Sequence, residues 1–511
     1  MTGGHVVVVG GGLAGITAAI GLREAGLEVT LLEARPRLGG AASSFSRGEL
    51  SIDNGQHVFL RCCASYQELL AKLGATDLVT VQERFDVTVV SARGQARLRR
   101  TGLPGPLHMG QALTGYRLLP LAERLKVARA ALALRCVDPA DPAADRIALG
   151  TWLAGKGQSE RARRLLWDLF IVSAMNIAGD DASLALAATV IRMALLGARD
   201  AADIGIATVP LGDLHGRAAA ALLGKLGAQV RLGARAAGIE PLPGGGLRVG
   251  LTYDRSGADR LDGAVRADGG PLPPDSEAGD AGPRGQGGQG GQDADEAGLA
   301  LLADGVVLAV PAAQAARLAG AAGVTDATRW DGLGASPIVN VHVVYDRRVT
   351  DLPFAAAVES PVQWVFDKTR QSGLAAGQYL ALSLSAADGY VDVPAAALRE
   401  EFLPALEQLF PAAAGAEVTD FFVTRERRAT FRQAPGVGAL RPGAVTSVPG
   451  LVLAGAWTDT GWPDTMEGAV RSGQRAAEEM THGLAGRLGG QPAHDRAGPR
   501  PAATATTGAG S

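Results

Sequence analysis

Cysteine is scarce in this sequence of 511 residues, which contains only Cys62, Cys63 and Cys136. These three form neither a Cys-x-x-Cys pair nor a metal-ligand spacing, so we expect no disulfide framework, no metal site and a reducing cytoplasmic environment. Long apolar runs are also missing, because no stretch reaches the ~18 residues that a membrane-spanning helix needs. The apolar run His5–Val9 is too short for a signal peptide and leads directly into glycines. We therefore expect a cytoplasmic protein.

Charge of one sign and aromatic side chains are also in short supply. The net charge of −3 gives no reason to expect a nucleic-acid partner. Aromatic residues make up 5% of the chain and hydrophobic residues 47%, so alanine, leucine and valine must fill most of the core. The chain is long for a single core, and two or three packed units are expected.

The N-terminal residues show a strand–helix–strand pattern. His5–Val9 is typical of a buried parallel strand, Leu13–Ala25 of the following helix and Glu28–Leu32 of the next strand. Strand-like apolar runs return near residues 229–232, 305–310 and 450–455. We predict an α/β fold in which a Rossmann-type nucleotide-binding domain is assembled from discontinuous segments.

Two further units are expected between these segments. Alanine-, leucine- and arginine-rich stretches beyond Arg100 predict a helical cap, and alternating strand-like runs with a helix over 395–409 predict an α+β substrate domain. Glycine, proline, aspartate and glutamine dominate the stretch before Gly305, which cannot bury enough apolar surface to fold. The predicted boundaries are 1–82, 209–255, 299–335 and 433–488 for the nucleotide-binding domain, 83–208 for the cap, 336–432 for the substrate domain, 256–298 for a disordered insertion and 489–511 for a disordered tail.

The most specific motif is Gly10-x-Gly12-x-x-Gly15, which follows the first strand and opens the first helix. Gly10 permits a tight turn, Gly12 lets the backbone approach a pyrophosphate, and Gly15 allows close packing of helix on sheet. Glu33 ends the second strand, where its carboxylate can accept hydrogen bonds from ribose hydroxyls. Strand, glycines, helix, strand and terminal acid together predict a dinucleotide site.

The residues after Glu33 resemble those of the FAD-dependent amine oxidases and isoprenoid desaturases. The run Ala34–Gly40 reads Ala-Arg-Pro-Arg-Leu-Gly-Gly, an extension that NAD dehydrogenases lack. The resemblance implies that Arg37 and the Gly-Gly backbone lie along the FAD phosphates and ribityl chain, where a guanidinium suits a diphosphate. On this resemblance the N-terminal FAD-binding residues are Gly10, Gly12, Leu13, Ala14, Gly15, Glu33, Ala34, Arg35, Arg37, Gly39 and Gly40.

A second family motif lies near the C-terminus. The apolar run Leu451–Gly455 is followed by Asp459, and Met466-Glu467 opens a helix. The resemblance places Gly455 and Asp459 near the ribityl and pyrophosphate and points the helix N-terminus, Met466-Glu467, at the flavin edge, where it favours the negative charge of reduced flavin. By the same resemblance the backbone of Ala236 meets the adenine. Because no cysteine follows Cys136, a C-terminal cysteinyl link is excluded and the FAD is expected to be non-covalent.

Two short runs narrow the resemblance to one branch, the hydroxysqualene dehydroxylases of squalene metabolism. They are Asp-Asn-Gly-Gln-His at Asp53–His57 and Thr-Asp-Thr-Gly-Trp-Pro at Thr458–Pro463. The resemblance implies that Gly55 and Gln56 pass beneath the isoalloxazine ring. His57 is a candidate proton donor, since histidine titrates near neutrality, and Asp464 is the second candidate. A structural, hydrogen-bonded histidine at position 57 is an equally open interpretation.

The function implied by this branch is reductive removal of a hydroxyl group from hydroxysqualene, giving squalene for hopanoid or related triterpene synthesis. Three alternatives stay open: an FAD-dependent desaturase acting on phytoene or a similar polyprene, an amine oxidase, and a non-catalytic prenyl-binding escort protein. The intact phosphate motif argues against the escort. The electron donor and the oligomeric state cannot be read from the sequence.

The stretch 110–135 combines many leucines with Arg117, Arg124, Lys126, Arg129 and Arg135. A basic amphipathic helix of this kind can lie on an anionic membrane surface, and an enzyme that acts on an insoluble isoprenoid would benefit from such contact. Solvated charges over the core of the cap are the alternative interpretation. We therefore expect a cytoplasmic protein with possible peripheral contact at the inner face of the membrane.

Overall fold

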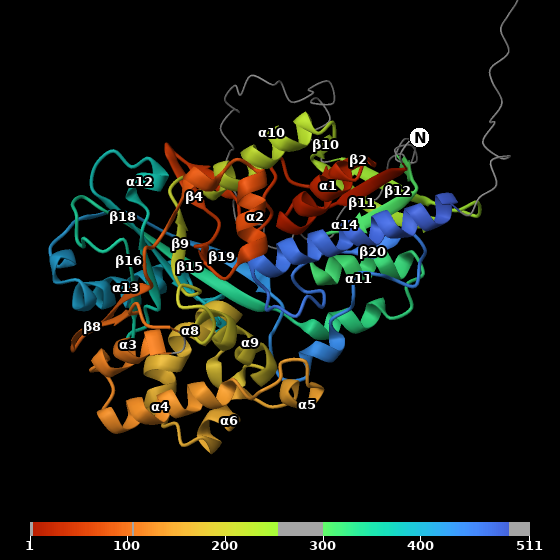
Figure 1. Cartoon of the computed structure of the whole chain (residues 1–511). Coiled ribbons are helices and arrows are strands. Elements are labelled where there is room, and N and C mark those ends of the chain that lie inside the picture. The colour runs from red at the N-terminus through yellow and green to blue at the C-terminus, as the bar shows by residue number, and fades with distance from the viewer. Residues whose placement is uncertain (1–3, 105–106, 254–299, 490–511) are drawn as a thin grey trace, which may run out of the picture.

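The structure is a computed structural model that describes residues 4–104, 107–253 and 300–489 (Figure 1). The predicted insertion 256–298 lies outside the described residues, and so does the predicted tail 489–511 apart from its first residue. No helix within the described ranges is long and apolar enough to cross a membrane.

A five-stranded parallel sheet forms the core of the first unit and confirms the predicted α/β fold. Its order is β10-β2-β1-β14-β20. Four separated segments of the chain supply its strands: the first gives both β1 (His5–Val9) and β2 (Glu28–Glu33), and the others give β10 (Gln229–Leu232), β14 (Gly305–Leu308) and β20 (Leu451–Leu453). Val6, Val7 and Val8 are fully buried, as expected for a parallel strand that is covered on both faces.

The first and last helices of the described chain lie side by side over this sheet (Figure 1). They are α1 (Leu13–Glu24) and α14 (Met466–Gly489). Gly473 permits the close approach, because a Cβ there would clash with the backbone carbonyl of Ala14. Further helices are α10 (Ala218–Lys225) and α11 (Ala312–Ala321), and a three-stranded antiparallel sheet follows β10, formed by β11 (Ala234–Pro241), β12 (Leu247–Tyr253) and β13 (Ala300–Ala303).

A seven-stranded sheet forms the second unit, in the order β19-β15-β18-β17-β16-β7-β8. Helix α13 (Ala395–Leu409) packs its apolar face, including Phe402, against valines and leucines of the sheet. The range 83–208, expected as a helical cap, thus begins with a β-hairpin of this sheet, because the alternating residues of Asp86–Ser91 pair with a neighbouring strand. The strands are β7 (Asp86–Ser91), β8 (Gly94–Arg99), β15 (Ser336–Tyr345), β16 (Phe354–Ala357), β17 (Trp364–Asp367), β18 (Gln378–Leu384) and β19 (Val418–Thr430).

Helices occupy the chain from residue 110 to 194 and gather at the lower edge of the molecule in Figure 1. Most of α9 is buried, which fits its nearly apolar sequence. The helices are α3 (Gly110–Gly115), α4 (Leu121–Leu134), α5 (Pro142–Asp145), α6 (Leu149–Gly155), α7 (Glu160–Ala162), α8 (Asp168–Met175) and α9 (Leu184–Ala194).

Short elements connect the two sheets. They are the hairpin β3 (Ser44–Arg47) and β4 (Leu50–Asp53), the small sheet of β5 (Val58–Leu60), β6 (Val79–Val81) and β9 (Ile204–Ala207), α2 (Ala64–Lys72) and α12 (Thr369–Ser372).

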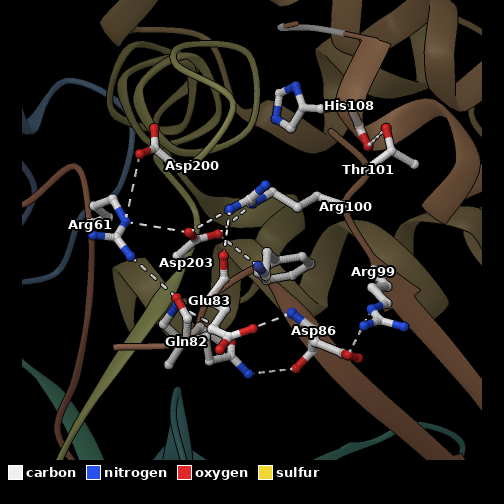
Figure 2. A network of polar contacts seen from close by, with 12 residues as sticks. Arg61, Gln82, Glu83, Asp86, Arg99, Arg100, Thr101, His108, Asp200 and Asp203 are labelled. Carbon is white, nitrogen blue, oxygen red and sulfur yellow. Dashed lines mark hydrogen bonds and ion pairs between the residues drawn. The ribbon is translucent and has the colours of Figure 1, made fainter. Parts of the chain in front are cut away.

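A buried carboxylate ties these connections to the seven-stranded sheet (Figure 2). Asp203 is fully buried before β9 and binds Arg100, just after β8, through Nε–Oδ1 and Nη2–Oδ2 contacts of 2.6 and 2.8 Å. It also accepts from the Phe85 amide at 2.7 Å and from Arg61 Nε at 3.3 Å. Burial acts to raise the pKa of Asp203, but the hydrogen bonds and charge of Arg100 outweigh burial and lower that pKa. The carboxylate therefore stays charged and cross-links three segments.

Candidate functional site

The glycine motif forms the turn between β1 and α1. Gly10 has a φ of +109°, and a Cβ there would clash with the Ala309 carbonyl oxygen. A Cβ on Gly15 would likewise clash with the Gly10 carbonyl oxygen. Gly12 is the N-cap of α1 and offers no side-chain cap, so the first amide groups of the helix, at Leu13 and Ala14, have no partner among the described residues and can bind an anion.

Glu33 and the Gly-Gly pair hold a second loop against this turn. The Glu33 carboxylate accepts from the amides of Gly11 at 2.7 Å and Arg35 at 2.8 Å. The Gly39 amide donates to the Gly11 carbonyl at 2.8 Å. A Cβ on Gly40 would lie 2.9 Å from Gly12 Cα. The two loops therefore meet backbone to backbone, and any side chain at Gly40 would separate them.

The polar atoms left over in this region fit a dinucleotide. Arg37 Nε is buried and has no hydrogen-bond partner among the described residues. Arg37 belongs to the loop Glu33–Gly40, which packs against the turn at the N-terminus of α1. Arg35 is exposed and Ala34 is partly buried between it and Glu33. A diphosphate would supply the missing acceptor for Arg37, since guanidinium groups bind phosphate oxygens in a bidentate manner.

The structure places Ala236 in β11 of the antiparallel sheet, where it is buried. The link between this sheet and the nucleotide loops is the Gly233 amide, which donates to the Arg35 carbonyl at 3.2 Å. A contact of Ala236 with the adenine stays a prediction.

The C-terminal motif folds as strand, turn and helix. Gly455 follows β20 with a φ of +145°, and its amide donates to Ser472 Oγ of α14 at 2.8 Å. Asp459 is exposed, and its Oδ1 accepts from the Gly461 amide at 3.3 Å. Trp457 is buried and donates from Nε1 to the Val310 carbonyl at 3.0 Å, so it packs the loop against the core.

Glu467, in the first turn of α14, uses its side chain for another purpose. The buried carboxylate accepts from the amides of Ser65 at 3.2 Å and Tyr66 at 2.8 Å, and so caps the N-terminus of α2. It also accepts from Arg471 Nε at 2.7 Å. The backbone amides of Met466 and Glu467 are thus the groups that can face a flavin.

The Asp53–His57 run crosses from β4 to β5 against the seven-stranded sheet. Its outer end is fixed by Asp53, which accepts from Ser44 Oγ at 2.7 Å and from the Leu211 amide at 2.9 Å and pairs with Lys368 Nζ at 2.8 Å. Asp53 and Lys368 are both buried.

At its other end the run leaves polar atoms without partners. Asn340 Nδ2, from β15, donates to the Asn54 carbonyl at 3.3 Å, but Asn340 Oδ1 and Gln56 Nε2 are buried without a hydrogen-bond partner among the described residues. The Gly55 carbonyl accepts from His57 Nδ1 at 3.0 Å. Burial lowers the pKa of His57, so its imidazole is mainly neutral at pH 7. The unpaired amide groups suit a ring that carries both donors and acceptors, as a flavin does.

Asp464 stands two residues before α14. Its Oδ2 accepts from the Phe431 amide at 2.9 Å, and its own amide donates to Gln433 Oε1 at 3.1 Å. Burial raises the pKa of Asp464 to about 6, although Phe431 and Arg441 partly oppose this. The carboxyl group is therefore partly protonated near neutral pH.

Besides Lys368, two groups near the site were missed in the sequence. His215, in the π-helical turn Gly212–Arg217, contacts the Ala42 carbonyl through Nδ1 at 3.1 Å and the Tyr66 hydroxyl through Nε2 at 2.8 Å. Burial lowers the pKa of His215 to about 4, so the ring is neutral at pH 7. Because the Ala42 carbonyl can only accept, Nδ1 carries the proton and Nε2 accepts from the Tyr66 hydroxyl. Asn340 is the other. An asparagine inside the largely apolar strand β15 was a usable signal for it.

These features define a member of a known flavoenzyme family. The family described as flavin containing amine oxidoreductases matches residues 13–268 and 286–481. The chain belongs to this family, and it is an FAD-dependent oxidoreductase.

Individual relatives confirm the resemblance to the hydroxysqualene dehydroxylases. Proteins of that name from Sinorhizobium fredii and Rhodopseudomonas palustris are each 29% identical, over 93% of this chain and 97% of theirs. A zeta-carotene desaturase from Zea mays is 25% identical over 92% of this chain and 82% of its own.

Solved structures agree on the fold. A cyclohexylamine oxidase from Brevibacterium oxydans superposes with a TM-score of 0.64 at 19% identity, covering 94% of this chain and 100% of that one. An oxidoreductase from Methanosarcina mazei gives a TM-score of 0.64 at 16% identity, over 93% and 100% of the two chains.

Proposed function

We propose that this enzyme removes the hydroxyl group of hydroxysqualene reductively and forms squalene for hopanoid or related triterpene synthesis. The proposal is supported by the two relatives of that name and by the runs Asp53–His57 and Thr458–Pro463. The observation that carries it is Asp464, a partly buried carboxyl group whose pKa is raised to about 6 and which stands two residues before the helix proposed to face the flavin. Removing a hydroxyl group as water requires a proton donor at that place.

In the proposed reaction some residues bind the cofactor and another transfers the proton. The loops at Gly10–Gly15 and Glu33–Gly40 hold the FAD phosphates, and the N-terminus of α14 lies at the flavin edge. Reduced FAD, when bound, supplies the hydride that replaces the hydroxyl group on carbon. The alcohol, one proton and one hydride thus give the hydrocarbon and water. Protonated Asp464 donates the proton to the departing hydroxyl oxygen.

His57 becomes the weaker candidate for the acid. Its Nδ1 proton is already held by the Gly55 carbonyl, and burial lowers its pKa, which reduces the population of the imidazolium form at pH 7. We propose that His57 positions the Asp53–His57 turn against the flavin and that Asp464 is the acid.

Desaturation of a polyprene is the second candidate function. It is favoured by the zeta-carotene desaturase relative, and it would require Asp464 to accept a proton instead of donating one. The direction of electron flow separates the two candidates. The similarity to a cyclohexylamine oxidase structure, at 19% identity, concerns the fold alone and does not favour amine oxidation.

The test is anaerobic turnover of the reduced holoenzyme with hydroxysqualene across pH. Because the donor must be protonated, the rate is expected to be highest below about pH 6 and to fall as pH rises above it. Asp464→Asn should lose roughly 100-fold or more in rate while retaining FAD. Asp168→Asn is the matched control, because burial also raises the pKa of Asp168, in α8, to about 6. Equal rates in both variants would remove Asp464 from the mechanism.

Contact with a membrane surface belongs to the same proposal. Hydroxysqualene and squalene are nearly insoluble in water, so an enzyme that exchanges them with a bilayer avoids transfer through solvent.

A further inference from the structure

One helix of the cap exposes an unusual number of apolar side chains. Five of the eleven large apolar residues that are exposed within the described part of the chain lie between 103 and 132. On α4, Leu121 and Leu125 are each 58% exposed and Leu132 is 48% exposed. Leu103 and Leu107, exposed by 52% and 62%, lie in the connection from β8 to α3. Figure 1 shows α3 and α4 at the outer edge of the molecule.

The three leucines of α4 form one stripe. At 100° per residue, their directions fall within about 40° of one another on the helix surface. Arg135 borders the stripe on one side and Arg129 on the other, with Lys126 beyond Arg129. Valine and alanine on the opposite face, including Val127, are buried against the cap. The leucine stripe therefore does not contribute to the core of the molecule.

Charge complementarity identifies what covers the stripe. Residues 110–135 contain five basic side chains and one carboxylate, although the whole chain has a net charge of −3. The carboxylate, Glu123, is turned inward and accepts from Ser159 Oγ at 2.9 Å. Within the described residues no ion pair involves Arg117, Lys126, Arg129 or Arg135. Unpaired cations beside exposed leucines match an anionic headgroup layer over acyl chains.

We propose that the leucine stripe of α4 docks this protein on an anionic lipid bilayer, with Leu121, Leu125 and Leu132 in the acyl boundary. Lys126, Arg129 and Arg135 bind lipid phosphates beside them, since long basic side chains can reach the headgroup level from a helix lying in the interface. The inference deepens the membrane contact of the proposed function by naming the surface that binds and the lipid charge that it selects, and it rests on that function in naming what the docked enzyme would take from the bilayer.

The experiment is co-sedimentation of the FAD-loaded protein with vesicles of phosphatidylglycerol and phosphatidylcholine, and with vesicles of phosphatidylcholine alone. The protein is expected to bind the mixed vesicles and to lose affinity as salt is raised. Leu121→Glu with Leu125→Glu should weaken binding at least roughly tenfold. Leu302→Glu with Val445→Glu, at positions 64% and 65% exposed, is the matched control and should bind as the wild type does. Lys126→Glu with Arg129→Glu should abolish the preference for anionic vesicles.

Three results would overturn the inference: wild-type binding by the leucine variant, equal losses in the control, or a wild-type dimer that ignores vesicles and separates in the leucine variant. The last would make the stripe an interface between two copies of the chain. Squalene formation from hydroxysqualene in detergent separates this inference from the proposed function. The leucine variant should keep that activity, and failed vesicle binding with intact activity would contradict the inference alone.

Discussion

At the scale of single residues, the site combines groups that already have partners with groups that lack them. The carboxylates of Glu33, Asp53 and Glu467 accept hydrogen bonds from backbone amides. Those of Asp53 and Glu467 also pair with Lys368 and Arg471. Arg37 Nε and Asn340 Oδ1, in contrast, are buried and unpaired among the described residues. A buried polar atom without a partner is costly, so we expect a bound cofactor to contribute the missing hydrogen bonds to these atoms.

Arg37→Ala is expected to weaken FAD binding by roughly 10- to 100-fold, because a hydrogen bond to a charged group contributes about 1.5–3 kcal/mol. Fluorescence titration of the flavin-free protein with FAD measures this. Arg93→Ala, at an exposed arginine in the turn between β7 and β8, provides the control. Wild-type affinity in the Arg37 variant would show that the guanidinium does not bind the diphosphate.

His215 gives a pH dependence of stability. Its pKa is about 4 in the folded protein, below its ordinary value of 6.5, so the unfolded chain binds the proton more readily between these values. The contribution of His215 to the free energy of unfolding is therefore fully present above pH 6.5 and is lost as the pH is lowered toward 4, by on the order of 3 kcal/mol. Urea unfolding followed at several pH values should show a smaller slope for His215→Gln. If the pH dependence of the free energy of unfolding were the same in this variant as in the wild type, His215 would not be its source.

At the scale of elements, the sequence predicts correctly those helices and strands that depend on local interactions and misses those that depend on distant ones. The strand Gln229–Leu232 and the helix Ala395–Leu409 were predicted with their observed bounds, because their periodicity is local. The strands β5, β6 and β9 were missed, since each has three or four residues and depends on pairing with a distant segment.

The candidate site shows the same division. The glycine motif, Glu33 and Arg37 could be found because their spacing is local. Lys368 and Asn340 reach the Asp53–His57 run from positions about 300 residues away, and no local pattern specifies that meeting. The inward capping role of Glu467 was also invisible, because the helix that it caps lies about 400 residues earlier in the chain.

The link between α14 and α2 predicts a loss of stability when Glu467 is removed. Glu467→Ala leaves the first amides of α2 uncapped and is expected to lower the free energy of unfolding by about 1–2 kcal/mol. Urea unfolding of the FAD-loaded protein checks this, with Glu479→Ala as the control because the pair of Glu479 with Arg475 lies on the surface. Equal effects of the two substitutions would argue against a capping role.

At the scale of the whole molecule, two sheets are built from interleaved segments of one chain. The five-stranded sheet uses four separated segments, and the seven-stranded sheet draws β7 and β8 from before the helices of residues 110–194. Asp203 joins these parts where β8 ends and β9 begins. The turn at Asp53–His57, which we propose faces the flavin, leads directly into β5, so the relative position of the two sheets also positions the candidate site.

Asp203→Asn is therefore expected to destabilise the molecule by about 3 kcal/mol, since it leaves Arg100 without its buried partner. The pKa of Asp203 is lowered in the folded protein, so its contribution is present at neutral pH and is lost as pH falls into the acid range. Urea unfolding measures the change. Asp392→Asn removes an exposed pair with Arg427 and should be close to neutral; a loss no larger than this for Asp203→Asn would exclude a central role.

The direction of electron flow tests the proposed function most directly. The enzyme is reduced without oxygen and mixed with hydroxysqualene while flavin absorbance and product are followed together. The proposed function predicts that FAD is reoxidised and that one squalene forms for each FAD. Flavin that stays reduced with no squalene formed, together with reduction of the oxidised enzyme by phytoene, would contradict reductive dehydroxylation and identify a desaturase.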